Sequence, residues 1–316
     1  MLEMILMLTF CFSNPFEIEA PTTTNPTVED YKNAQAALRK IEIGHLIKKL
    51  YPADWEKEIA KSSKYFYKKE DFILRCSKAL SQNLFLYNPK TIFSEGTDKK
   101  NCVVGYCSYN GPLSNLLEEL EIALREVGFC GGIYYRTGGY PTPRGDELKF
   151  AGVPYAFKLF MIEEAFKLGF EQVLWLDSSV WPLSSIDDLF QEIKKEGFLF
   201  DWGKPNLYGI LPVAKKALEE YLGRDFIKER KIAGWIMGMS SLDPRTKNIL
   251  KDYRVLVEMG IPFLSVNPEE YVITNILLKH GVEARARKNF MITCTKNNST
   301  YVDAIKKGCK FIIRVH

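Results

Sequence analysis

Apolar residues recur at helical spacing in the first part of the chain and change to short continuous runs from Asn101 onward. The helical pattern covers Val28 to about Leu50 and two charged stretches at 55–67 and 69–83. An apolar start and a Pro- and Thr-rich linker precede it over residues 1–27. We therefore expect three parts, which are the segment 1–27, a helical appendage over 28–98 and a larger domain over 99–316.

The larger domain begins with a strand, a helix and a second strand, at Cys102–Tyr106, Leu113–Val127 and Gly131–Tyr135. The helix has leucines on one face and acids on the other. This order is the unit of a parallel sheet covered by helices, so the pattern predicts an α/β fold. Later helices are expected at 153–169, 184–190, 214–222, 243–259 and 271–280, and later strands at 172–176, 197–200, 231–240 and 310–316.

The clearest single stretch is Gln172–Leu183, in which an apolar run leads directly into Asp177, Ser178 and Ser179. Such a run indicates a buried strand, and ligands bind at the carboxyl ends of strands in open α/β sheets. A carboxylate at that end can reach a metal ion or a ligand hydroxyl. Asp-Ser-Ser is also ordinary turn chemistry, and the residues of this stretch alone favour neither interpretation.

Composition narrows the classes of function. The net charge of +4 is too small to indicate a nucleic-acid partner. No G-x-G-x-x-G follows the first strand, so a dinucleotide site is unsupported. The chain has 7 cysteines without C-x-x-C spacing and only 3 histidines, which makes a zinc site improbable. Several cysteines lie in apolar runs, so buried free thiols and a reducing compartment are favoured.

The first residues raise a question of targeting. Ile5–Phe12 is apolar and has the length of a signal-peptide core, but Glu3 precedes it and Lys or Arg does not. The run is too short to span a membrane. We expect a cytoplasmic protein without a transmembrane span, and export through Met1–Ser13 is the alternative.

Several charged residues have both a structural and a functional interpretation. Arg136 precedes the Gly- and Pro-rich loop Thr137–Phe150 and Arg144 lies within it, and both are anion contacts or surface charges. Lys158 lies near a helix start, where the helix dipole does not favour a cation, so it is a surface lysine or a charge directed at phosphate or Asp177. Glu269 and Glu270 are first-turn acids, one of which could line a site. In the strand 231–240, Gly234 and Gly238 allow another group to approach the backbone closely.

Two motifs carry a resemblance to a known family. Pro154-Tyr155-Ala156-Phe157-Lys158 and Leu174-Trp175-Leu176-Asp177-Ser178-Ser179 resemble the core of GT-A-fold glycosyltransferases, in a group of bacterial and viral proteins. The resemblance covers about Val153 to Phe190 and is weaker over Lys231–Lys279. It implies a GT-A-like catalytic domain with a mixed, mostly parallel sheet, and the residues before the first strand show no such resemblance.

The resemblance also implies a chemistry. The donor would be a nucleotide-diphosphate sugar, and the acceptor would be a glycan, lipid or protein. A D-x-D motif in the family binds Mn²⁺ or Mg²⁺, which neutralises the leaving diphosphate. Asp177 takes the place of the first acid, while Ser179 stands where the second is expected, and His316 is the candidate that would complete the metal's ligands.

The remaining site residues follow by position in the family. Lys158, Arg144, Ser178 and Ser179 would lie near the donor, and Glu269 or Glu270 would be the base of an inverting transfer. The main alternative is an inactive or weak nucleotide-sugar-binding protein whose D-x-D has become Asp-Ser-Ser. A nucleotidyltransferase is disfavoured because the loop Ser108–Pro112 lacks basic residues, and the buried strands disfavour a purely helical interaction protein.

Overall fold

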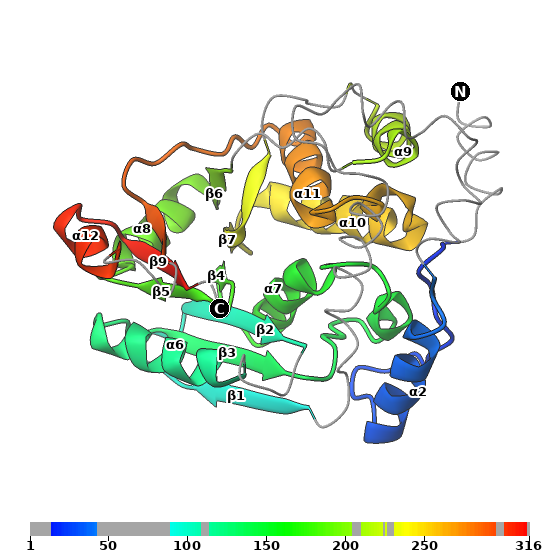
Figure 1. Ribbon diagram of the computed structural model, residues 1–316, viewed down its shortest axis with the longest axis horizontal. Helices are drawn as coiled ribbons and strands as arrows, with labels where there is room; N and C mark the ends of the chain where they lie inside the picture. The colour runs from blue at the N-terminus through cyan, green and yellow to red at the C-terminus, as the bar shows by residue number, and fades with distance from the viewer. Residues whose placement is uncertain are drawn as a thin grey trace.

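The computed structural model describes residues 14–42, 89–108, 114–203, 210–223, 225, 231–294 and 300–314. Its centre is a six-stranded sheet with the strand order β1-β3-β2-β4-β7-β6 (Figure 1). The strands are β1 (Lys90–Ser94), β2 (Asn101–Cys107), β3 (Gly132–Thr137), β4 (Gln172–Leu176), β6 (Phe198–Trp202) and β7 (Ile232–Ser240). The predicted strands at 102–106, 131–135, 172–176, 197–200 and 231–240 are confirmed, and β1 was not predicted.

The sheet is mixed, and most of its strands share one direction. β2 pairs in parallel with both β3 and β4. β7 runs antiparallel to both of its neighbours, so β6 again runs with β4. At the other edge, β1 is antiparallel to β3. The expectation of an α/β fold with a mixed, mostly parallel sheet is therefore confirmed.

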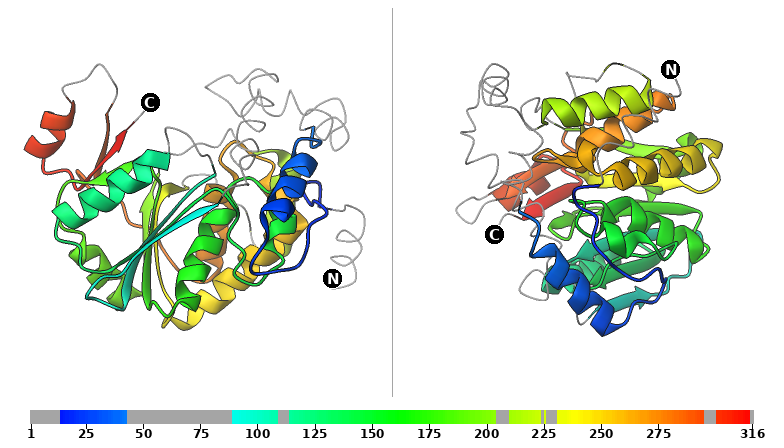
Figure 2. Two further views of the ribbon diagram at one scale, coloured as in Figure 1. Left: turned by 90° about the horizontal axis from the view of Figure 1, so that it is seen from below. Right: turned by 90° about the vertical axis from the view of Figure 1, so that its right-hand side faces the viewer.

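Helices cover both faces of this sheet (Figure 2). On one face lie α7 (Phe157–Lys167), α10 (Pro244–Met259) and α11 (Pro268–Lys279), and on the other α6 (Ser114–Glu126) and α8 (Asp187–Glu196). Because successive side chains of a strand point to opposite faces, Val104 joins the first cluster and Val103 the second. The same alternation sends Val173 and Trp175 toward α7, and Asp177 follows in that register.

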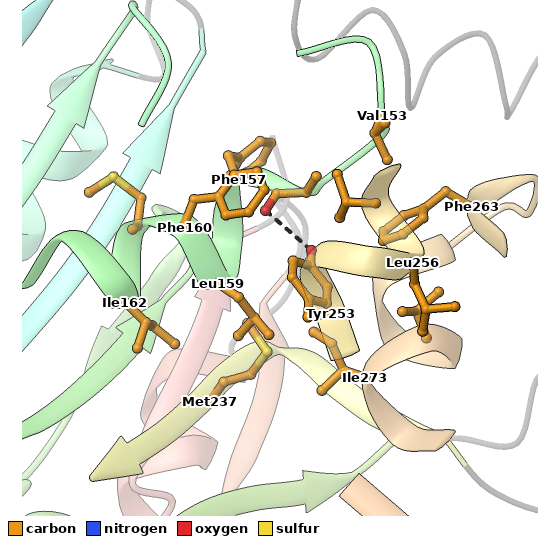
Figure 3. Packing of buried hydrophobic residues seen from close by; sticks show 14 of the residues in the cluster. Val153, Phe157, Leu159, Phe160, Ile162, Met237, Tyr253, Leu256, Phe263 and Ile273 are labelled. Carbon is orange, nitrogen blue, oxygen red and sulfur yellow. Dashed lines mark hydrogen bonds between the residues drawn. The ribbon is translucent and has the colours of Figure 1, made fainter. Parts of the chain in front are cut away.

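The start of α7 is fixed by the core around it. Phe157 and Phe160 pack among buried residues of α10, α11 and β7, as Figure 3 shows. The Tyr253 hydroxyl of α10 donates to the Ala156 carbonyl at 3.2 Å. The expected helix 153–169 is thus shorter at its beginning, because residues 153–156 form turns before α7 starts at Phe157.

The described N-terminal residues pack on the same core. Phe16 and Ile18 are buried in it, and the Asn14 side-chain amide donates to the Val257 carbonyl at 2.9 Å. The predicted helix from Val28 is α2 (Val28–Leu38), which begins with a capping box at Thr27. It ends earlier than the expected Leu50, because residues 39–42 are not helical. The helices predicted at 55–67 and 69–83 lie outside the described residues. The division at 27 and 98 stays a prediction.

A small second sheet adjoins Asp177. It has the order β5-β9-β8, with β5 (Val180–Pro182), β8 (Met291–Cys294) and β9 (Phe311–Arg314), and α12 (Thr300–Lys306) packs on it. The extended exit after Asp177 is β5, and the predicted last strand is β9. Three further elements complete the described chain, namely η1 (Glu147–Phe150), α9 (Pro212–Leu222) and η2 (Ile261–Phe263).

The expected buried thiols are found in Cys102, Cys107 and Cys309, whereas the Cys130 thiol is exposed. Among the residues that the structure describes, no helix combines the length and hydrophobicity that crossing a bilayer requires.

The predicted cap of α10 is confirmed and gives a test of the fold. Asp243 Oδ1 accepts hydrogen bonds from the Arg245 backbone N–H and guanidinium, each at 2.9 Å. We expect Asp243→Ala to lower the free energy of unfolding by about 1 kcal/mol in urea titrations at neutral pH. Asn248→Ala, an exposed position of the same helix, is the matched control.

This cap should also depend on pH. Hydrogen bonds from Arg245 hold the pKa of Asp243 below its usual value. A lowered folded-state pKa gives stability that is present at neutral pH and is lost as the pH falls through that pKa. The difference between wild type and Asp243→Ala should therefore shrink on acidification. An unchanged difference would contradict this role of the carboxylate.

Candidate functional site

Asp177 lies directly after β4, at the carboxyl end of the strand. Its backbone N–H donates to the Trp235 carbonyl of β7 at 3.0 Å, so its position is fixed by the sheet. Its side-chain Oδ1 accepts from the indole N–H of Trp175 at 2.9 Å. The side chain remains 33% exposed. The Asp177 carboxylate is thus held through Oδ1 and remains partly exposed to solvent.

Lys158 joins Asp177 to two other elements. Its Nζ lies 3.2 Å from Asp177 Oδ1 and 2.9 Å from Glu269 Oε1, and it donates to the Gly234 carbonyl at 2.9 Å. One hydrogen bond and two ion pairs thus hold the ammonium among three protein oxygens. Lys158 therefore fixes α7 against β4, β7 and α11.

Two neighbouring carboxylates keep the side chain of Lys158 charged. The residue is only 4% exposed, so it is not a surface lysine. Burial opposes the charge, but Asp177 and then Glu269 outweigh burial and hold the pKa of Lys158 above its usual value. Asp177 and Glu269 therefore stabilise the ammonium of Lys158 in the first turn of α7, where the helix dipole does not favour a cation.

A second ion pair lies beside the first. Lys231, which is buried, pairs with Glu270 Oε2, and the Gly234 N–H donates to Glu270 Oε1 at 3.1 Å. A Cβ on Gly234 would lie 2.9 Å from Glu269 Oε1 and 3.0 Å from Glu270 Cγ. The predicted close approach to this strand is therefore made by the two acids of α11.

These residues form one charged cluster, which we call the Asp177 cluster and which consists of Lys158, Asp177, Lys231, Glu269 and Glu270. Its three carboxylates and two ammonium groups leave a formal charge of −1. The side chain of Asp177 is the most exposed acid at 33%, followed by Glu270 at 16% and Glu269 at 5%. The cluster can accept hydrogen bonds from ligand hydroxyls, chiefly through Asp177.

The other predicted site residues lie as follows. Ser178 and Ser179 form the half-exposed turn after Asp177, which the Val180 N–H closes by donating to the Asp177 carbonyl at 2.9 Å. Arg144 pairs with Glu163 at 2.6 Å, and no contact among the described residues joins it to the Asp177 cluster. Arg136 likewise pairs with Glu164. His316 lies outside the described residues.

The described residues do not by themselves fit a protein-held divalent metal. No group of three or more His, Cys, Asp or Glu side chains among them could hold an ion. Asp177 Oδ1 is already engaged by Lys158 and Trp175, which leaves one carboxylate oxygen and the Ser179 hydroxyl as oxygen ligands. A hard cation takes about six such ligands. The predicted ligand set of Asp177, Ser179 and His316 stays a prediction.

Three residues of this region were not singled out from the sequence. Trp175 is two positions before Asp177, and strand alternation places both on one face, which was a usable signal. Lys231 begins the glycine-containing strand but has no local signal of its own. Tyr155 belongs to the first motif, and its ring centroid lies 5.3 Å from Lys158 Nζ. The contact of Lys231 with Glu270, by contrast, depends on the long-range packing of β7 against α11.

Comparisons with known proteins complete the description. No protein-family model matches the chain, and no curated protein matches it. Among solved structures, the chain is similar to a glycosyltransferase involved in glycosylation of the major capsid of PBCV-1, with a TM-score of 0.41 and 13% identity over 68% of this chain and 93% of that one. Mouse xyloside xylosyltransferase 1 gives a TM-score of 0.38 and 11% identity over 69% and 97%. The galactosyltransferase LgtC gives 0.38 and 14% over 68% and 87%.

Proposed function

We propose that the protein is a glycosyltransferase that moves a sugar from a nucleotide-diphosphate sugar to an acceptor. One observation carries the proposal. Lys158 and Asp177, which belong to the two motifs that resemble GT-A glycosyltransferases, form an ion pair at the carboxyl end of β4. The two motifs thus meet in one site, at the edge of the sheet where ligands of α/β proteins bind.

We assign the donor contact to Asp177. Trp175 and Lys158 both engage its Oδ1, so the carboxylate is oriented before a ligand arrives. A fixed, partly exposed acceptor suits a sugar hydroxyl, because little reorganisation is needed on binding. Lys158 is buried among three protein oxygens, which leaves it poorly placed for a phosphate, and we assign it the role of positioning Asp177. Ser178 and Ser179 line the same turn and would face the donor.

The acceptor side is assigned to α11. An inverting transfer needs a carboxylate to take the acceptor's proton as the oxocarbenium-like transition state forms. Glu270 is more exposed than Glu269, whose carboxylate is buried against Lys158. We therefore favour Glu270 as the base and Glu269 as the partner that keeps Lys158 charged. Arg144, which is bound to Glu163, has no role in this scheme.

No step of this scheme passes through a metal ion. Mn²⁺ or Mg²⁺ would supply positive charge for the leaving diphosphate if Asp177, Ser179 and His316 held it as the family resemblance implies. A second candidate function, a nucleotide-sugar-binding protein without turnover, is favoured by Ser179 standing in place of the second acid. Turnover separates these two candidates, and metal dependence is a separate readout.

The experiment is a thermal-shift screen of UDP, GDP, CDP and ADP and of their glucose conjugates, with and without Mn²⁺. A ligand at about a hundred times its dissociation constant adds about 2.7 kcal/mol of stability. We expect the nucleotides of one base to raise the melting temperature of the wild type, and the sugar conjugate to raise it further than the diphosphate. Asp177→Ala should lose this additional shift. No shift with any member of the panel would overturn the proposal.

A further inference from the structure

The backbone of Tyr155 adopts a conformation that tyrosine disfavours. Its φ is +60°, in the left-handed region. Among the described residues, one other non-glycine residue, Asn289, has a positive φ, and asparagine tolerates this region well. A bulky side chain there is an outlier that persists only where the surroundings enforce it, and such outliers cluster at functional sites. The residues around Tyr155 must therefore enforce its backbone conformation.

The core on both sides of Tyr155 enforces this conformation. Val153 and Ala156 are completely buried, and the Ala156 carbonyl accepts the hydrogen bond from Tyr253. The turn sets the direction in which the Tyr155 side chain leaves the backbone, just before Lys158. As a result, the ring lies over the ammonium of Lys158, 5.3 Å from ring centroid to Nζ. This is a favourable cation–π distance beside the Asp177 cluster.

The hydroxyl of Tyr155 is a hydrogen-bond donor without a partner among the described residues. Burial and the negative charge of Glu269 raise the pKa of Tyr155 to about 12, so the phenol is protonated at neutral pH. The side chain is half-buried and thus open on one side. The hydroxyls of Tyr106, Tyr134 and Tyr253 have partners within the protein. The Tyr135 hydroxyl has none in the described part of the chain, but its side chain is completely buried and cannot meet a ligand.

The two ammonium groups of the Asp177 cluster, on Lys158 and Lys231, are buried and paired with the cluster's own carboxylates. Donors for a ligand must therefore come from partly exposed hydroxyls nearby, which are those of Ser178, Ser179 and Tyr155. An oxygen-rich ligand at Asp177 needs donors from the protein as well as acceptors. We propose that Tyr155 is a ligand-contacting residue that donates its O–H to an oxygen of the nucleotide sugar bound at Asp177. This inference rests on the proposed function.

The test is the affinity of wild type and Tyr155→Phe for the nucleoside diphosphates and their glucose conjugates, measured by calorimetry. Phenylalanine keeps the ring over Lys158 and removes only the hydroxyl. We expect affinity to fall about tenfold, equivalent to about 1.4 kcal/mol, with the melting temperature of the free protein unchanged. Tyr221→Phe, which loses a hydrogen bond to Asp252 instead, is the control that should keep full affinity.

The two forms of ligand locate the contact. A tenfold loss for the diphosphate and its conjugate alike assigns the hydroxyl to an oxygen of the nucleoside diphosphate, and a loss for the conjugate alone assigns it to an oxygen of the transferred sugar. Equal affinity of wild type and Tyr155→Phe for every ligand overturns the inference while the proposed function stands. A wild type that binds none of the ligands overturns both.

A matched pair of variants tests the backbone conformation in solution. Tyr155→Gly and Tyr155→Ala remove the same ring, but only glycine adopts a positive φ without strain. We expect Tyr155→Gly to melt at a higher temperature than Tyr155→Ala, the reverse of their order at an ordinary site. If Tyr155→Ala melts at the same or a higher temperature, the turn that directs the ring toward Lys158 is absent, and the inference fails.

Discussion

Asp177→Asn is expected to slow sugar transfer by about 10²- to 10³-fold, the range seen when one preorganised electrostatic group is removed from an active site. The amide keeps the size of the side chain and retains an oxygen that can accept from Trp175. It removes the negative charge that Lys158 and the bound donor face. Steady-state rates at saturating nucleotide sugar measure this effect.

The same substitution should leave the protein folded. Lys158 keeps its bonds to Glu269 and the Gly234 carbonyl, and Asp177 is partly exposed. Unfolding in urea therefore serves as the internal check on Asp177→Asn. Asp187→Asn, which changes an exposed first-turn acid of α8, is the matched control and should retain full activity. Equal rates for Asp177→Asn and the control would remove Asp177 from the site.

The largest effect on stability is expected from Lys158→Met. Breaking a buried ion pair by removing one partner costs about 3–5 kcal/mol, because the remaining charge is left without compensation. Glu269, whose side chain is 5% exposed, would lose the ammonium that lies 2.9 Å from its Oε1 and, among the described residues, would keep only the weaker attraction of Lys231. Urea titration should show this loss in the free energy of unfolding.

Two further variants test whether the loss of stability comes from the buried ion pair of Lys158. Lys167→Met removes an exposed lysine of the same helix that donates one hydrogen bond, to the Pro143 carbonyl, and should cost only about 1 kcal/mol. The double variant Lys158→Met with Glu269→Gln should recover part of the loss, since the buried carboxylate is then neutral. If Lys158→Met is as stable as Lys167→Met, the three-way contact of Lys158 with Asp177, Glu269 and Gly234 does not hold α7 in place.

The parts of the fold that could be predicted are those written in local periodicity. The apolar run before Asp177 predicted β4, and the amphipathic pattern at 113–127 predicted α6. β1 was missed because an edge strand has little buried surface and thus little apolar pattern. α7 begins later than expected because Tyr155 turns left-handed, a conformation that nothing in its residue type predicts.

The site was predicted as a set of residues but not as an arrangement. Lys158, Asp177, Glu269 and Glu270 do meet, whereas Arg144 is bound elsewhere to Glu163. The partners of Lys158 include a carbonyl that is 76 positions away in sequence. Such pairings depend on how α7, β7 and α11 pack, and local spacing contains no information on that packing.

The most direct test of the central claim is the release of nucleoside diphosphate from nucleotide sugars, quantified by mass spectrometry with a pool of saccharide acceptors. The full-length wild type and Asp177→Asn are compared. We predict that the wild type releases the diphosphate from one nucleotide sugar in an acceptor-dependent manner, and that Asp177→Asn does so at least about a hundredfold more slowly. Acceptor-dependent release at the same rate by both proteins, or none by the wild type from any nucleotide sugar, would contradict a glycosyltransferase centred on Asp177.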